Sequence, residues 1–298
     1  MNDFQKLENK RQKLVEEIKQ GRKKALIPLG LGIVLILIAA VSMIQPLLII
    51  GIIVVVVGII MMGLAYKGVG PYNKTVKSEV ISVLLKDTYE DVIYDQNRGL
   101  PIAQILKTGT VKRPDRYSAE DYFSATYKGV KFETSDVDLK ERVEHRDSKG
   151  HVHVSYETYF KGRWITYYFE RHFKEGLKII ESKFGFNKRG YEKMDTESIE
   201  FNKKFTIYTT SKQYGFYQIT SAMIERLLKL EKMHRGQIVY CFMDNQLHIG
   251  INDRKDYLEL SYKTPISEEG LSSTIDDIEL IAAIINEFRL DSQKFKKQ

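Results

Sequence analysis

One uninterrupted apolar stretch decides the fold of this chain: residues 25–66, which read ALIPLGLGIVLILIAAVSMIQPLLIIGIIVVVVGIIMMGLAY. It contains no charged side chain, and a single helix of this length would be about 63 Å long. The hydrocarbon core of a bilayer is roughly 30 Å thick, so the stretch is twice as long as one crossing needs. Gln45 and Pro46 interrupt it near its middle, where proline disfavours a continuous helix. We therefore predict two transmembrane helices, residues 25–44 and 47–66, joined by a tight turn at these two residues.

Small residues recur at every seventh position within both predicted helices. The two sets mirror each other about Gln45, which pairs position 39 with 51, 32 with 58 and 25 with 65. Such a stripe lets two backbones approach closely, as packed membrane helices do. The general frequency of glycine in membrane helices is a simpler explanation of the same pattern. We predict that the stripe is the packing face of a transmembrane hairpin. Its members are Ala25, Gly32, Ala39, Gly51, Gly58 and Ala65.

Positive charge flanks the apolar stretch on both sides. Lys23 and Lys24 directly precede it, Lys67 follows it, and the predicted turn has no charge. The positive-inside rule then places both termini in the cytoplasm. A cleaved signal peptide would have an apolar segment of only about 7–15 residues, which excludes that alternative. We predict a plasma (inner) membrane protein that crosses the lipid bilayer with two helices.

The charge balance argues against nucleic-acid binding. The chain has 46 Lys and Arg against 39 Asp and Glu, a net charge of +7. Residues 1–24 hold +4 of this charge, which leaves +3 for the whole remainder. Positive charge beside a bilayer attracts anionic lipid, whereas a nucleic-acid interface needs a concentrated basic patch. The single cysteine, Cys241, excludes a disulfide scaffold and fits a cytosolic location.

Residues 1–24 are predicted to form an amphipathic lead-in helix in the cytosol. Phe4, Leu7, Leu14 and Ile18 follow a heptad-like spacing that Arg11 interrupts. Two heptads are too few to indicate a coiled coil. Three placements stay open for this helix: on the lipid head groups, paired with another helix, or continuous with the first membrane helix.

Residues 67–298 are predicted to form a cytosolic α+β domain with a mainly antiparallel sheet and packed helices. Two helices are expected first, at 74–87 and 102–106. From residue 121 onward, alternating apolar side chains indicate strands, with turns expected at 128–129, 147–150 and 161–162. The strand at 152–160 alternates strictly, so its side chains at the even positions are expected to face the core.

The C-terminal third mixes strands and helices. Strands are expected at 205–208, 214–219, 238–243 and 247–251. A helix is expected at 220–236, and a final helix from Ser273 or Thr274 with a buried stripe made of Ile278, Ile281, Ile285 and Phe288. No internal repeat is visible. We therefore divide the chain into a lead-in helix at 1–24, a transmembrane hairpin at 25–66 and a cytosolic domain at 67–298.

Six short stretches, taken in order, resemble an uncharacterised bacterial family of membrane-anchored proteins, DUF3137. They are DRYSAED at 115–121, YKGVKFE at 127–133, FKG at 160–162, FNKKF at 201–205, ITSAMIERL at 219–227 and DNQLHI at 244–249. The resemblance extends from about residue 72 to 290, behind a similar membrane hairpin. These motifs are turn and strand patterns and carry no reactive groups. The resemblance implies no assigned activity, so it supplies no catalytic residue.

His151 and His153 are candidate metal ligands. Being two residues apart on a predicted strand, they share a face, and imidazole is a common zinc ligand. A metal site also needs a third ligand and groups that orient the ligands, and an exposed polar face beside a loop explains the pair more simply. The sequence has no Walker loop, dinucleotide fingerprint or nucleophile elbow. We predict no catalytic residue, no bound metal and no cofactor.

Aromatic side chains crowd the strands between residues 156 and 169. Both strand faces carry rings, which indicates either a two-sided core or an exposed surface for a partner. The candidate residues for such an interaction surface are Tyr159, Trp164 and Tyr168.

These observations predict an integral inner-membrane protein that acts as a non-enzymatic, cytosol-facing interaction or scaffold module. Its expected partners are the lipid bilayer and a protein in the membrane or the cytosol, and not nucleic acid. Two alternatives stay open. One is a structural subunit of a membrane complex, and the other is a membrane-anchored, metal-dependent enzyme that uses His151 and His153.

Overall fold

The computed structural model describes residues 2–146, 148, 150–181, 188–233 and 236–296. The chain divides into two compact units. The helical unit consists of Met1–Val80 and Leu260–Ser273, and the sheet unit consists of Ile81–Glu259 and Thr274–Gln298. Long apolar helices come first and a mainly antiparallel sheet with packed helices follows, so the predicted α+β class is confirmed.

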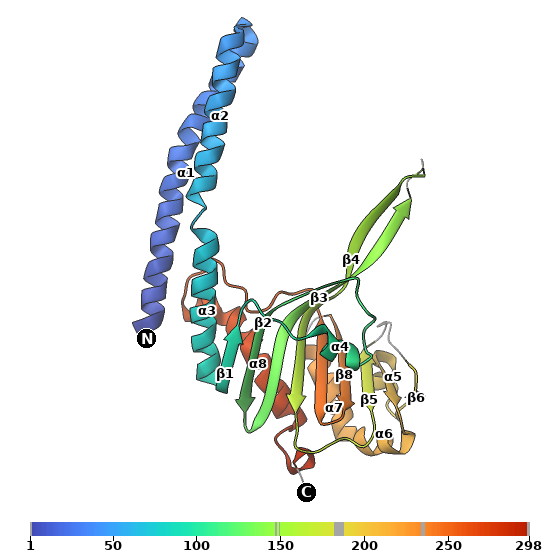
Figure 1. The fold of residues 1–298 in the computed structure, drawn as a ribbon. Coiled ribbons are helices and arrows are strands. Elements are labelled where there is room, and N and C mark those ends of the chain that lie inside the picture. Colours follow the sequence, from blue (N-terminus) through green and yellow to red (C-terminus); the bar gives the residue numbers. More distant parts are fainter. Residues whose placement is uncertain (1, 147, 149, 182–187, 234–235, 297–298) are drawn as a thin grey trace. The chain divides into compact units, whose positions relative to one another are not determined.

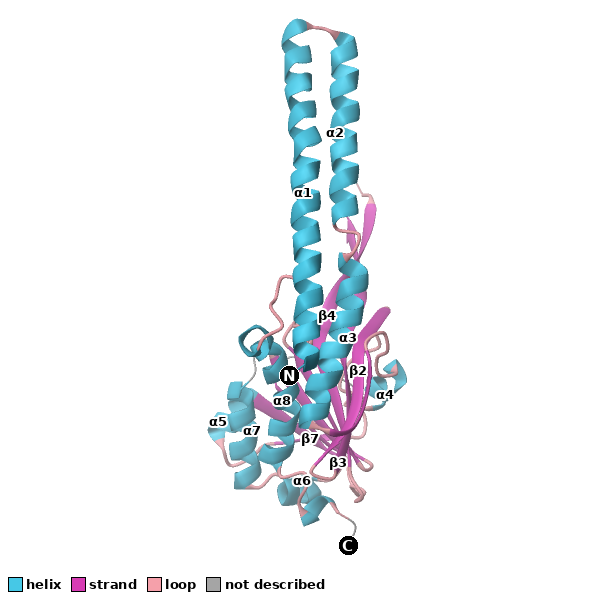
Figure 2. Cartoon of the chain, turned by 90° about the vertical axis from the view of Figure 1, so that its left-hand side faces the viewer, coloured by secondary structure: helices cyan, strands magenta, loops and turns pink. Residues whose placement is uncertain are grey.

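Two long helices form the hairpin of the helical unit. α1 (Asn2–Ser42) and α2 (Gln45–Ala65) lie side by side in both views (Figures 1 and 2). The turn between them contains Met43, whose φ is +54°, and it precedes the predicted position. Gln45 and Pro46 instead begin α2, because a proline at a helix start lacks only a donor that would have no partner there. The lead-in segment is continuous with the first apolar helix, one of the three placements left open.

Arg11 interrupts the apolar pattern of α1 because it makes a specific contact within the helical unit. Its Nε and Nη2 donate to both carboxylate oxygens of Glu8, at 2.8 and 2.7 Å. Its Nη1 donates to the carbonyl of Tyr262 at 3.1 Å, and Glu8 accepts from the backbone N–H of Ile266 at 2.8 Å. The Arg11 guanidinium lowers the pKa of Glu8 to about 2. This ion pair fixes the 262–266 segment to the first helix.

Nine strands within the described residues form one antiparallel sheet (Figure 1). Their spatial order is β1-β2-β3-β4-β9-β8-β5-β7-β6. The strands predicted from residue 121 onward pair in chain order as β2, β3 and β4, and the strands predicted at 238–243 and 247–251 pair as β8 and β9. The bounds are β1 (Glu90–Asp95), β2 (Arg116–Tyr127), β3 (Val130–Arg146), β4 (Val152–Tyr168), β5 (Leu177–Glu181), β6 (Glu192–Met194), β7 (Phe205–Thr209), β8 (Gln237–Met243) and β9 (Gln246–Asn252).

Helices cover both faces of the sheet. On one face, Tyr167 donates to the carbonyl of Ile281 in α8 at 3.2 Å. On the opposite face, Trp164 packs in a buried cluster with Ile105 of α4, because adjacent side chains of a strand point to opposite faces. The stripe predicted for the last helix is buried as expected. The helices are α3 (Val69–Thr88), α4 (Ile102–Lys107), α5 (Ile199–Lys204), α6 (Lys212–Gln218), α7 (Ser221–Met233), α8 (Glu268–Phe288) and the 3-10 turn η1 (Gln293–Phe295).

Two predicted boundaries in the C-terminal third are wrong. Residues 214–219 are largely helix α6 instead of a strand, because the side chain of Ser211 accepts from the N–H of Tyr214 and caps a helix there. The last helix begins at Glu268, five residues earlier than Ser273, and Ser267 accepts from the N–H of Gly270 at 3.2 Å. Residues 234–235 of the predicted 220–236 helix lie outside the described residues.

The outer half of the β3–β4 hairpin extends from the sheet as a two-stranded ribbon (Figure 1). The predicted burial of its even positions is wrong for Val152 and Val154, which are 47% and 45% exposed, because neither another strand nor a described helix covers them. The predicted turn at 161–162 is also wrong, since β4 is continuous there. Gly162 has φ +148°, and a Cβ at this position would collide with the carbonyl oxygen of Ile251 on β9.

Candidate functional site

The outward surface of the α1–α2 hairpin is apolar between residues 26 and 64. Ile27, Val41 and Met43 are 72%, 87% and 88% exposed, and many other Ile, Leu and Val side chains between residues 26 and 64 are similarly exposed. Soluble monomers rarely expose contiguous apolar patches larger than a few hundred Å². Both helices are long and apolar enough to cross a membrane.

The inward surface of the hairpin is lined by small residues. Ala25, Gly32, Ala39, Gly51 and Gly58 of the predicted stripe are buried, and Ala65 is half-buried. A Cβ at Gly32 would lie 2.8 Å from both the Gly51 carbonyl oxygen and the Val55 backbone nitrogen. Gly32 therefore faces Gly51 and Val55 instead of Gly58, because the turn lies nearer to the N-terminus than predicted. That this stripe packs the hairpin inside a membrane stays a prediction.

The two histidines proposed as metal ligands lie at the exposed tip of the β3–β4 ribbon. His153 is the cross-strand neighbour of His145, whose Nε2 lies 3.3 Å from Glu157 Oε1. Across the described residues, no group of three His, Cys, Asp or Glu side chains is placed to hold a metal ion. The geometry of His151 and His153 thus offers no third ligand from the described part of the chain.

The three aromatic residues proposed as an interaction surface differ in their exposure. Trp164 is 0% exposed and its ring packs against Phe160, with ring centroids 5.7 Å apart, so its assignment to a surface is wrong. It is buried because helix α4 covers this face of the sheet. Tyr159 and Tyr168 are half-buried. The Tyr159 hydroxyl donates to the carbonyl of Lys112 at 2.5 Å, and the Tyr168 hydroxyl donates to Glu133.

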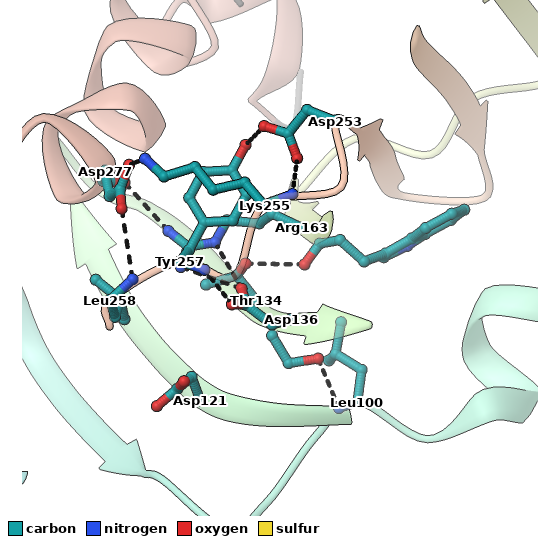
Figure 3. A network of polar contacts seen from close by, with 12 residues as sticks. Leu100, Asp121, Thr134, Asp136, Arg163, Asp253, Lys255, Tyr257, Leu258 and Asp277 are labelled. Atoms are coloured by element: carbon teal, nitrogen blue, oxygen red, sulfur yellow. Dashed lines mark hydrogen bonds and ion pairs between the residues drawn. The ribbon is translucent and has the colours of Figure 1, made fainter. Parts of the chain in front are cut away.

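A buried charge network occupies the other face of the sheet (Figure 3). Arg163 of β4 is 0% exposed, and its Nε and Nη2 both donate to Asp136 Oδ1 of β3 at 3.2 Å. The other oxygen of Asp136 accepts from the backbone N–H of Tyr257 at 2.5 Å. Burial raises the pKa of Asp136 to about 7, and the Arg163 guanidinium opposes this shift. Nη1 of Arg163 donates to the carbonyl of Asp277 at 3.1 Å.

The same network holds residues 253–258, an irregular segment that follows β9 in the chain, against β4 and α8. Lys255 pairs with Asp277, and the hydroxyl of Tyr257 donates to Asp253 at 2.6 Å. The Arg163 guanidinium stacks 4.1 Å from the centroid of the Tyr257 ring. These groups satisfy one another, as Figure 3 shows, so we interpret the network as structural. The sequence indicates that Arg163 is buried, because it lies on the same face of its strand as the apolar residues Ile165 and Tyr167.

A pocket of about 220 Å³ lies elsewhere in the sheet unit, between β5, β8, α6, α7 and the end of α8. Its interior is formed mainly by Phe173, Leu177, Phe242 and Phe295, and three cations, Arg226, Arg289 and Lys294, also line it. These residues come from segments that are up to about 120 positions apart in the chain. Sequence reasoning missed the pocket, because no local pattern connects such distant segments.

A comparison with protein families supports the resemblance found in the sequence. Residues 158–290 match the family described as "Protein of unknown function (DUF3137)". Among solved structures, the chain is similar to the crystal structure of the mycobacterial trehalose monomycolate transport factor A, TtfA, with a TM-score of 0.40 and 6% sequence identity. That likeness covers 71% of this chain and 95% of the other. A search of curated proteins found no match.

Proposed function

We propose that this chain, whose residues 158–290 match the DUF3137 family of unknown function, is a membrane-anchored, non-catalytic binding module. In this proposal the α1–α2 hairpin crosses the bilayer twice at about residues 25–66. Residues 67–298 then form a cytosolic domain that holds a ligand or a protein partner near the membrane. Residues 2–24 are then the cytosolic part of α1.

The observation that carries the proposal is the inverted burial of the hairpin. Its large apolar side chains point outward, as Val41 at 87% exposure illustrates, while Ala25, at 0%, and its small neighbours point inward. This arrangement is unfavourable in water, because it leaves large apolar side chains exposed and buries only small ones. Lipid would, because membrane helices associate through close packing of small residues.

Flanking charge supports the proposed orientation. The apolar stretch is bordered by Lys23 and Lys24 on one side and by Lys67 on the other. The turn at Met43 contains no charged residue. The positive-inside rule favours the cytoplasmic side for both ends of the hairpin. In this proposal the sheet unit lies in the cytosol, at the inner face of the plasma membrane.

An anchor exchange separates a tethered module from a structural subunit that uses the hairpin as its contact surface. Residues 25–66 are replaced by an unrelated two-helix anchor of the same topology, and partners of both proteins are quantified by mass spectrometry after extraction in mild detergent. We expect the same partners in the same ratio to the bait. If the exchange variant is folded and resides in the membrane but loses every partner, the result would contradict a tethered module. It would favour a structural subunit that binds its partners through the hairpin.

A further inference from the structure

The interior of the pocket in the sheet unit is built from rings that hold one another in place. Phe173 packs edge-on against Phe242, with centroids 5.5 Å apart and planes at 88°. Phe295 lies 4.7 Å from Phe169 and 6.3 Å from Phe173. Phe242 and Phe295 are 5% and 8% exposed in spite of the adjoining space. The rings of the apolar interior therefore hold one another in place, which reduces the ordering cost of binding.

Three cationic side chains line the same pocket. Arg226 comes from α7, Arg289 follows α8, and Lys294 lies in η1. Within the described residues, none of these three side chains forms an ion pair, and no acidic side chain lines the pocket. A fourth cation, Arg171, lies close, since its Nη1 donates to the carbonyl of Lys294 at 3.1 Å.

Neighbouring cations of the same unit behave differently. Lys229, also on α7, pairs with Glu287 at 2.5 Å, and Lys204 pairs with Glu231 at 2.5 Å. The pKa of Lys294 is lowered, first by desolvation and then by the positive charges of Arg171 and Arg226. Cations that crowd one another beside an apolar cavity favour an anionic ligand, because an anion supplies the missing counter-charge in a partly desolvated place.

We infer that this pocket binds a single-chain anionic amphiphile, with its apolar chain among the phenylalanine rings and its anionic head group between Arg226 and Lys294. The volume of about 220 Å³ is small compared with pockets that hold drug-sized ligands, so it fits one chain and not two. This inference deepens the proposed binding function by naming a ligand class, and it does not depend on the hairpin crossing a membrane.

Photolabelling of the full-length protein in lipid nanodiscs tests this inference. The probe is an octanoate analogue with a diazirine near the end of its chain, and labelled residues are mapped by peptide mass spectrometry. We expect labels on Phe173, Met223, Phe242 or Phe295, and we expect octanoate to compete for them. Octyltrimethylammonium, which has the same chain and the opposite charge, is the control competitor. Equal competition by the cation, or labels confined to α1 and α2, would overturn the inference.

Charge-removing variants assign the head-group contact. Arg226→Gln and Lys294→Gln are each expected to reduce pocket labelling at least about tenfold, the loss expected for one charge-assisted hydrogen bond. Lys232→Gln removes an equal charge from an exposed position of the same helix and is expected to leave labelling unchanged. Equal labelling of all three variants, in samples with wild-type protease resistance, would contradict the inference.

Membrane residence of the same variants is measured separately by alkaline carbonate extraction. Pocket labelling in a protein that carbonate releases would refute the proposed anchor and leave the ligand assignment standing. A carbonate-resistant protein without pocket labelling would refute the ligand assignment and leave the proposed anchor standing. Failure of the inference and failure of the proposed function are thereby distinguished.

Discussion

The hairpin and the sheet unit use the same amino acids with opposite burial. In the hairpin, Ile27 is 72% exposed and Ala25 is 0% exposed, whereas in the sheet unit Ile249 and the charged Arg163 are both 0% exposed. The sheet unit hides its apolar side chains from water and pairs the charges that it buries. The hairpin shows its apolar side chains outward and hides its small ones. This difference indicates two different solvents, with lipid as the one we propose for the hairpin.

The largest expected effect comes from breaking the buried charge network. Arg163→Met leaves the carboxylate of Asp136 buried without its main counter-charge, which costs about 3–5 kcal/mol of unfolding free energy at pH 8. Denaturant unfolding, followed by the fluorescence of Trp164, the only tryptophan, measures this loss. Arg254→Met, at an exposed position, is the matched control. A loss below about 1 kcal/mol would show that the network does not stabilise the sheet unit.

A pH dependence between about pH 6.5 and 4 is expected from His248 in the sheet unit. His248 is buried, with Nδ1 3.1 Å from Thr166 Oγ1 and Nε2 3.0 Å from Gln246 Oε1. Burial, aided by the charge of Lys107, lowers its pKa from 6.5 to about 4. Between these pH values the imidazole of His248 binds a proton in the unfolded chain but not in the folded chain. Acidification therefore lowers the contribution of His248 to the unfolding free energy, by up to about 3 kcal/mol, whereas the raised pKa of Asp136 contributes with the opposite sign.

His248→Gln identifies the source of this pH dependence. The variant is expected to unfold with a smaller pH slope between about pH 6.5 and 4, because its amide does not titrate. Denaturant unfolding at several pH values measures the slope for both proteins. Equal slopes in the two proteins would assign the pH dependence to other groups.

A smaller effect is expected from overfilling the inner surface of the hairpin. Gly32→Leu forces a side chain against the backbone of Gly51 and Val55, which costs about 1–3 kcal/mol of helix packing. Gly30→Leu is the matched control on the same helix, since a Cβ there meets nothing within 4 Å. Disulfide formation in a Gly21→Cys/Ala65→Cys background reports helix proximity in membranes. Equal cross-linking in both leucine variants would exclude the stripe as the packing surface.

The smallest effect is expected at the ribbon of β3 and β4. Val154→Thr should change the unfolding free energy by less than about 0.5 kcal/mol, because this side chain is 45% exposed. Val137→Thr, on the covered part of β3 and 2% exposed, places a hydroxyl in the core and should cost about 1–3 kcal/mol. Similar losses for the two variants would mean that the ribbon is covered by a partner or a second copy.

Sequence periodicity predicted most elements of the fold but not their surroundings. The alternation at 152–160 correctly indicated a strand, yet it carried no information on whether another layer would cover Val152 and Val154. The aromatic residues at 214–217 follow a pattern that predicts a strand. They form a helix because Ser211 caps its N-terminus and because Gly215 packs against Met194. Tertiary contacts override the local sequence pattern at such positions. The pocket beside Phe295 was not predicted for a related reason, because only tertiary contacts bring its lining segments together.

Cysteine labelling with a membrane-impermeant maleimide tests the proposed anchor most directly. Met43→Cys marks the turn of the hairpin and Lys212→Cys marks the sheet unit. The native Cys241 is buried and its pKa is raised to about 12, so it stays unreactive. We predict that intact cells label Met43→Cys and that Lys212→Cys reacts only after lysis. Labelling of neither variant before lysis, with both proteins in the soluble fraction, would contradict a hairpin that crosses the membrane.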